Sequence, residues 1–186
     1  MSRFSRLATQ LAPVGQLQPQ ASSDWRGDFP LPQTLTDFYQ QVGPNNLQLC
    51  CDDLVEIPSL ARLWDYQAGY RWHSHSGEAI DGWQPNWLVI ADNNADPIVF
   101  DLNTERVLFD IHGGKWQFQP LAIDLETAFG AFATMAQAIA QCDADEYWDD
   151  DNCCYTPKAL DYRFTKLSKF LGSPQAASEF LSVLEW

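Results

Sequence analysis

The chain has few basic residues: 11 Lys and Arg stand against 25 Asp and Glu, which gives a formal net charge of −14. Proteins that bind nucleic acid hold its phosphates with basic side chains, and anionic membrane surfaces attract the same side chains. The charge therefore argues against nucleic acid and membrane surfaces as partners. It favours a basic protein partner, because an acidic surface attracts such a partner and speeds its association.

Long apolar runs are also missing, since no stretch approaches the roughly 20 residues of a membrane helix. The first residues, MSRFSRLATQLAPVGQLQPQ, lack the continuous apolar core of a signal peptide. The five Cys are an odd number and include two adjacent pairs, Cys50-Cys51 and Cys153-Cys154, a spacing that does not suit a zinc knuckle. Reduced thiols are the simplest interpretation, and we expect a cytoplasmic protein.

Common catalytic signatures are absent too: the sequence has no GxSxG, P-loop, GxGxxG or HExxH. We therefore expect no enzyme activity, no cofactor and no metal. His73 and His75 would share one face of a strand and could bind zinc, but further ligands are not evident nearby, and a polar surface loop is the simpler interpretation. His112 could act as a base only beside a nucleophile that the sequence does not identify.

What the chain does contain is enough apolar surface for one core, with 46% hydrophobic residues and eight Trp in 186 residues. Its first 30 residues are poor in apolar side chains and rich in Pro, Gln and Ser, so we predict a loosely ordered leader over 1–30. A single domain should occupy 31–186, with a core module over 31–140 and a C-terminal helical addition over 156–186.

Apolar side chains recur at helical spacing in five segments. We predict helices after Pro32, after Pro58-Ser59, from Asp124 to Ile139, after Thr156-Pro157 and after Ser173-Pro174. Asp124 and Thr156 are residue types that cap a helix N-terminus, and Pro suits the first helical position.

Short runs rich in Val and Ile between turn residues predict strands. One or two strands lie within 45–57, and four more follow: Trp87–Ala91, Ile98–Leu102, Val107–Ile111 and Trp116–Leu121. Their connections are too short for parallel crossovers, so we expect an antiparallel meander. The fold class is therefore α+β: a twisted antiparallel sheet with helices packed on one face, plus extra C-terminal helices.

Residues 86–102, NWLVIADNNADPIVFDL, place Asn and Asp in a turn between two apolar runs. Such oxygens could bind calcium, but the turn supplies few ligands and lacks the spacing of an EF-hand. Asn and Asp tolerate left-handed conformations, which favours a structural hairpin turn. Asp92 and Asp96 are secondary candidates for contact with a partner.

The most unusual segment is CDADEYWDDDNCCYTP, residues 142–157, where acidic side chains surround aromatic ones. Aromatic side chains anchor interfaces and charges at the rim set the association rate, so the segment suits docking of a basic protein. A solvated loop with Trp148 in the core is the plainer interpretation of such a charge run. The candidate partner-binding residues are Asp143, Asp145, Glu146, Tyr147, Trp148, Asp149, Asp150 and Asp151.

Four segments together resemble the SMI1/KNR4 family, also called the SUKH superfamily: LPQTLTDFYQQVGPNN, IPSLARLW, GWQPNWLVIADNNADPIVFDLNTERVLFDIHGG and LAIDLETAFGAFATMAQAI. The resemblance runs from about Leu31 to Ile139. The sequence departs from it at 93–95, where Asn-Asn-Ala replaces a turn that is often Gly-rich. It departs again at 43–45, where Gly-Pro-Asn replaces the usual Asn-Gly order. The helices beyond Asp143 lie outside the pattern.

The resemblance implies an α+β binding module without enzymatic activity. Bacterial members are commonly immunity proteins that neutralise secreted toxins, often nucleases, and fungal relatives regulate cell-wall synthesis. A nuclease holds phosphates with basic residues, so an acidic inhibitor could cover that surface. The leading hypothesis is an immunity protein that binds and neutralises a basic toxin. The alternative is a regulatory or scaffold module without a toxin partner.

Overall fold

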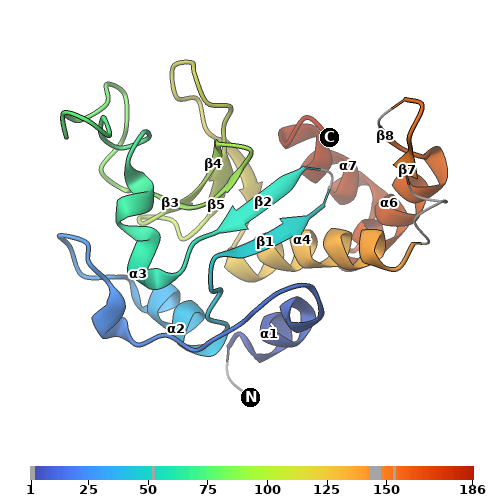
Figure 1. Ribbon diagram of the computed structural model, residues 1–186, viewed down its shortest axis with the longest axis horizontal. Coiled ribbons are helices and arrows are strands. Elements are labelled where there is room, and N and C mark those ends of the chain that lie inside the picture. The colour runs from blue at the N-terminus through green and yellow to red at the C-terminus, as the bar shows by residue number, and fades with distance from the viewer. Residues whose placement is uncertain (1–2, 52, 143–147, 153) are drawn as a thin grey trace.

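The computed structural model describes residues 3–51, 53–142, 148–152 and 154–186. Its centre is an antiparallel sheet of six strands in the order β1-β2-β3-β4-β5-β6. The strands are β1 Leu47–Cys50, β2 Leu54–Ile57, β3 Trp87–Asn93, β4 Asp96–Asp101, β5 Val107–Phe109 and β6 Gln119–Ala122. Neighbours in the sheet are also neighbours in sequence, which confirms the predicted meander (Figure 1).

The α-helices are α1 Ser5–Leu11, α2 Gln33–Gln41, α3 Leu60–Leu63, α4 Leu125–Ala140, α6 Pro157–Leu171 and α7 Pro174–Val183. Short 3-10 turns lie at η1 Ala12–Val14, η2 Ser22–Asp24 and η3 Asp65–Gln67. Three caps stand where they were expected. The side chains of Asp124, Thr156 and Ser173 each accept a hydrogen bond from a backbone N–H in the first turn of the helix that follows.

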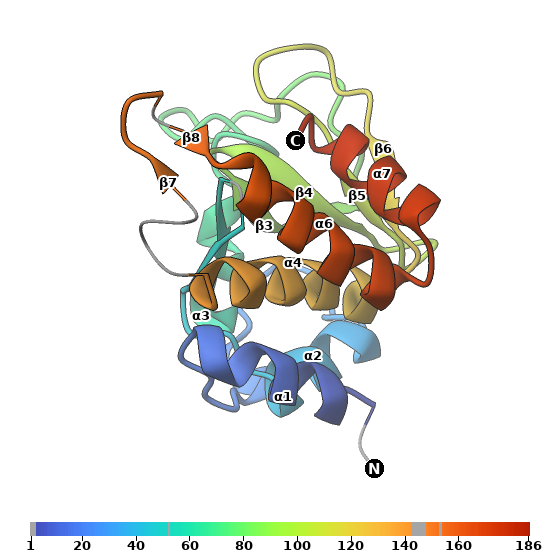
Figure 2. The ribbon, with the colours of Figure 1, turned by 90° about the vertical axis from the view of Figure 1, so that its right-hand side faces the viewer.

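Helix α4 forms the centre of the core, on one face of the sheet. Figure 2 shows it between the sheet and the pair α1 and α2, with α6 and α7 alongside. Eleven of its 16 residues are buried, more than one stripe would give, because neighbours pack on several of its sides. The α+β prediction with helices packed on one face is confirmed.

Gly130 on α4 lies directly against the Phe170 ring of α6. A Cβ added there would lie 2.4 Å from the tip of the Phe170 ring. Gly130→Ala should therefore lower the free energy of unfolding by about 1–2 kcal/mol, because overpacking outweighs the gain in helix propensity. Urea denaturation checks this, with Gly114→Ala, which meets no atom within 4 Å, as the control. In a Phe170→Leu background Gly130→Ala should become neutral or stabilising, and an unchanged penalty would contradict the clash.

The prediction of a loosely ordered leader is wrong for its first turns. Phe4, Leu7 and Leu11 are at most 1% exposed and belong to the main core. The Phe4 ring packs edge-on against Phe38, with centroids 5.7 Å apart. The spacing 4, 7, 11 is a helical stripe, but α1 is only seven residues long and its N-cap makes no side-chain hydrogen bond. Neither length nor capping therefore marked it in the sequence.

The following residues also pack against the domain. The Gln18 N–H donates to the Gly43 carbonyl at 2.7 Å, and the Gln20 N–H donates to the Tyr39 carbonyl at 3.0 Å. The Gln20 side chain accepts from the Leu60 N–H at 2.6 Å. Gly43, at φ +61°, lies so close that an added Cβ would be 1.9 Å from the Gln18 oxygen. Residues 4–20 are thus attached to the domain by both its core and its backbone.

The second face of the sheet, which we call the outer face, has a smaller cluster of its own. Tyr70, Val89 and Val99 are its buried members, and the side chains packed on them are Tyr66, Trp83, Trp87, Leu108, Trp116 and Phe118. Loop residues supply most of these rings. Aromatic loops therefore cover this part of the sheet where helices cover the other face.

Asp101 organises the turn that joins β4 to β5. Its carboxylate accepts from Asn86 Nδ2 at 2.6 Å, the Asn103 N–H at 3.0 Å and the Thr104 hydroxyl at 2.7 Å. Partial burial alone would raise the pKa of Asp101, but these hydrogen bonds, led by that of Thr104, lower it below the usual value.

A lowered pKa means that Asp101 stabilises the fold above the usual Asp value of about 4 and loses this effect as pH falls through its folded-state pKa. In thermal denaturation, the wild type should exceed Asp101→Asn in stability at pH 7. The difference in stability between the wild type and Asp101→Asn should decrease steadily toward pH 2. Because Asp101 is only partly buried, the effect should be small. A gap that widens in acid would contradict this assignment.

Candidate functional site

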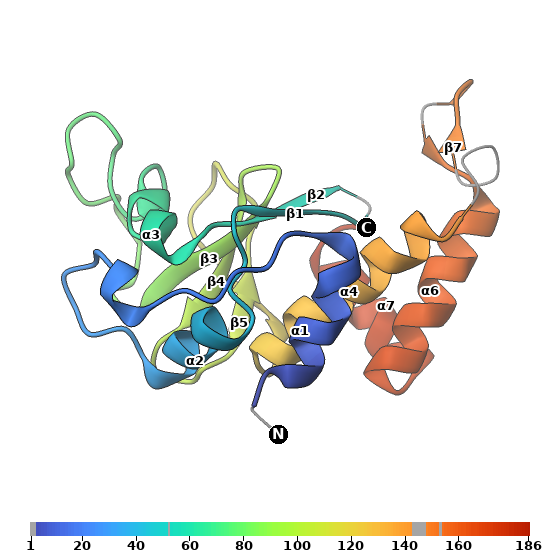
Figure 3. The ribbon, with the colours of Figure 1, turned by 60° about the horizontal axis from the view of Figure 1, so that its bottom comes forward.

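The acidic segment predicted as a docking surface is described only in part. Asp143, Asp145, Glu146 and Tyr147 lie outside the described residues. Trp148, Asp149, Asp150 and Asp151 lie on a hairpin formed by β7 Trp148–Asp149 and β8 Cys154–Tyr155, which we call the acidic hairpin. It stands beyond the ends of α4 and α6, apart from the sheet (Figures 1 and 3).

Trp148 packs within this hairpin and not in the core. The residue is 38% exposed, and its ring meets Tyr155 edge-on, with centroids 5.3 Å apart. Asp149 builds the turn: one carboxylate oxygen accepts the N–H groups of Asp151 and Asn152, and the other accepts Asn152 Nδ2 at 2.8 Å. These hydrogen bonds, first that of the Asn152 side chain, lower the pKa of Asp149. Asp150 and Asp151 are exposed.

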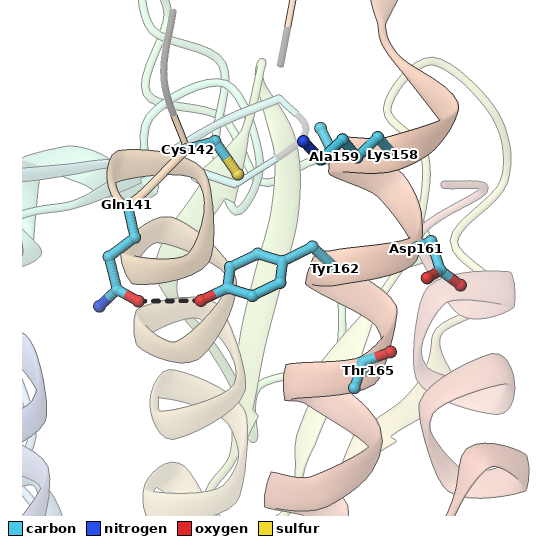
Figure 4. Close-up of a pocket in the computed structure, with 7 residues that line it drawn as sticks. All are labelled: Gln141, Cys142, Lys158, Ala159, Asp161, Tyr162 and Thr165. Atoms are coloured by element: carbon cyan, nitrogen blue, oxygen red, sulfur yellow. Dashed lines mark hydrogen bonds between the residues drawn. The ribbon is translucent and has the colours of Figure 1, made fainter. Parts of the chain in front are cut away.

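A cavity of about 470 Å³ lies where the acidic segment leaves α4 and enters α6. Its lining consists of Gln141, Cys142, Lys158, Ala159, Asp161, Tyr162 and Thr165 (Figure 4). The Tyr162 hydroxyl donates to Gln141 Oε1 at 3.1 Å and so links the two helices. The Lys166 ammonium lies 4.8 Å from the centre of the Tyr162 ring. This cavity therefore adjoins both ends of the acidic segment.

The turn between β3 and β4 carries the two secondary candidates. Asn94 and Ala95 have positive φ, and Asn93 pairs with Asp96, so the predicted hairpin is present. Asp92 accepts the Ala95 N–H at 2.9 Å, and Asp96 accepts the His112 N–H at 2.7 Å. Both carboxylates therefore have structural roles, and each keeps further lone pairs for a partner.

Beside this turn lies a second cavity, of about 280 Å³, which we call the tyrosine–carboxylate pocket. Its lining consists of Arg62, Asp65, Tyr66, Ala68, Tyr70 and Asp92. The Tyr66 hydroxyl donates to Asp92, and the Tyr70 hydroxyl donates to the Ala95 carbonyl at 2.9 Å. Burial raises the pKa of both phenols, and the charges of Asp92 and Glu56 raise it further, so both hydroxyls stay protonated at neutral pH.

Arg62 lies at the rim of this pocket. Its guanidinium is 3.6 Å from the Glu56 carboxylate on β2 and donates to Asn46 Oδ1 at 3.2 Å. Counting Glu56 with the lining, the pocket and its surroundings contain three carboxylates and one guanidinium. The pocket is therefore acidic, with aromatic walls.

The three His do not come together. His73 and His75 are exposed in the loop before β3. The His112 ring lies edge-on to Tyr70 at 5.6 Å and tilted against Trp116 at 5.7 Å. In the described part of the chain, no group of three or more His, Cys, Asp or Glu could hold a metal ion.

Sequence reasoning missed Tyr66 and Tyr70 as site residues, because Tyr66 fell within the helix predicted after Pro58-Ser59 and the segment from 70 to 83 shows no regular period. The signal that could have found them is the density of aromatic side chains, with Trp64, Tyr66, Tyr70, Trp72 and Trp83 within 20 residues. Such a density outside a helix or strand is typical of a surface that has to be covered or bound.

A meandering antiparallel sheet with helices packed on one face defines an α+β protein. The family model described as the SMI1 / KNR4 family (SUKH-1) matches residues 23–125, more than half of the chain, and the chain belongs to this family. The match begins inside the predicted leader and ends at the start of α4, earlier at both ends than the resemblance from Leu31 to Ile139.

A search of curated proteins found no match, and a search of solved structures found none either. None of the helices in the described residues is long and apolar enough to cross a membrane.

Proposed function

We propose that this chain is a non-catalytic protein-binding module that acts in the cytoplasm as a bacterial immunity protein. It binds a basic toxin domain and neutralises it by covering the toxin's functional surface. The observation that carries the proposal is the placement of charge. A chain of net charge −14 has acidic side chains beside aromatic rings at two surfaces, the acidic hairpin and the tyrosine–carboxylate pocket. The family resemblance adds the expectation of an immunity role.

The neutralisation is steric and electrostatic. Acidic side chains raise the association rate with a basic surface, and exposed aromatic rings supply contact area with little loss of conformational entropy. Trp148 is such a ring, held on the hairpin by Tyr155. A toxin that holds phosphates with Lys and Arg would present the matching charge. The bound chain would then occupy the surface that the toxin's substrate needs.

Association kinetics test the role of the hairpin, with a toxin domain captured on the immobilised chain as the partner. Asp150→Asn with Asp151→Asn should slow association several-fold at low salt and flatten its salt dependence. Asp149 stays unchanged in this variant because it caps the turn. Gln175→Ala, an exposed change on α7, serves as the control. An unchanged association rate would remove the acidic hairpin from the account.

A growth assay tests the function itself. Cells that express the captured toxin domain should stop growing, and co-expression of this chain should restore growth. Capture of cellular regulators, with no protection against any captured domain, would instead support the regulatory or scaffold module.

A further inference from the structure

The outer face of the sheet is open over β1 and β2. Gln48 and Cys50 on β1 and Leu54 on β2 are exposed there. Figure 3 shows α1 and α4 on one side of the strand pair β1 and β2. The Leu54 carbonyl accepts from the Asn94 N–H at 3.3 Å, so the open surface continues onto the β3–β4 turn. Apolar Leu54 and the tyrosine–carboxylate pocket thus belong to one surface.

The pocket has the groups that recognise a guanidinium. Carboxylates accept the N–H groups of Arg in pairs, and aromatic rings stack against its planar face. Asp65 is exposed, and Asp92 uses one lone pair on each oxygen for Ala95 and Tyr66, which leaves others available. The chain already holds one guanidinium at this rim, that of Arg62 beside Glu56. The negative charge of the surface is therefore complementary to a second guanidinium.

We propose that the tyrosine–carboxylate pocket receives an arginine side chain of the partner, with Asp65 and Asp92 as acceptors and Tyr66 as the aromatic wall. This inference rests on the proposed function and names the chemistry of one of its contacts. Lys is a poorer occupant, because an ammonium neither binds a carboxylate through a planar fork nor stacks on a ring as Arg does. The exposed Leu54 side chain offers apolar contact to the partner residues beside that arginine.

A hexa-arginine peptide is the probe, added to the full chain in low salt and followed by ¹⁵N–¹H spectra. The largest shifts should fall on Asp65, Tyr66, Tyr70 and Asp92, and a hexa-lysine peptide should bind more weakly. Asp65→Lys should weaken the peptide's affinity roughly tenfold, because it replaces an acceptor with a like charge. Asp28→Lys and Asp81→Lys make the same charge change at exposed positions outside both acidic surfaces, and each should weaken binding less than about twofold.

The peptide result separates this inference from the function. Largest shifts on the acidic hairpin, or equal losses in all three variants, would overturn the pocket as the arginine site. Thermal denaturation of each variant shows whether it is folded. If Asp65→Lys is unstable, Asp65→Asn replaces it and should still weaken binding more than Asp28→Asn. Protection of growth that persists in a variant without peptide binding would leave the function standing and the pocket refuted.

Discussion

Replacing Leu7 by Ala is expected to lower the free energy of unfolding by about 2–5 kcal/mol, the range measured when a buried Leu is cut to Ala. Leu7 is fully buried on α1, where it joins the core of the domain. A side chain on a loose leader would cost almost nothing on removal, so the size of the loss decides between the two descriptions.

Arg6→Ala is the matched control, since Arg6 is the exposed neighbour on the same helix. It should change stability by less than about 0.5 kcal/mol. Urea denaturation followed by Trp fluorescence compares the two variants. Equal urea midpoints for Leu7→Ala and Arg6→Ala would support the prediction of a loosely ordered leader over 1–30. A chain that begins at residue 23, where the family match begins, loses Phe4, Leu7 and Leu11 together and should not fold stably.

Gln67→Leu should cost roughly 2–4 kcal/mol, because it removes hydrogen bonds to three buried backbone groups, two of Val89 and one of Leu63. The Gln67 side chain accepts the Val89 N–H at 2.9 Å and donates to the Val89 carbonyl at 2.8 Å. It also donates to the Leu63 carbonyl. At Val89 the pairing of β3 with β2 has ended, since it covers only Val55 with Asn93 and Glu56 with Asp92. The Gln67 amide therefore supplies the hydrogen bonds to Val89 that the backbone of a neighbouring strand would otherwise supply.

Hydrogen exchange gives the residue-level check on Gln67→Leu. The Val89 amide should lose protection far more than that of Val99, its partner on β4. Gln40→Leu, an exposed position on α2, is the control and should leave both amides unchanged. A variant as stable as the control would show that Gln67 is not needed to complete the sheet.

Much of the fold follows from local pattern. Asp124, Thr156 and Ser173 were recognisable as caps because each stands before an apolar stripe. The β3–β4 hairpin was recognisable from Asn and Asp between two apolar runs. These elements depend on residues that are close in sequence, and such local patterns can be recognised in a single sequence.

The parts that sequence did not reveal depend on distant contacts. In the sequence Gln67 looks like any polar residue, and its role depends on its hydrogen bonds to Val89 in the folded chain. The tyrosine–carboxylate pocket likewise forms only because residues 62–70 pack against 92–96. Phe4 joins the core through its contact with Phe38, which lies 34 positions later in the sequence. The acidic candidates show a mixed outcome: Asp149 has a role within its turn, and the binding roles of Asp150 and Asp151 stay predictions.

Whether this chain protects a cell by binding a basic toxin can be measured directly as growth. A basic domain captured from the source organism on the immobilised chain is expressed in a host with and without this chain. Growth should stop without the chain and be restored with it, and the complex of the two proteins should weaken as salt rises. Arrest that continues in the presence of the folded, expressed chain would contradict the claim.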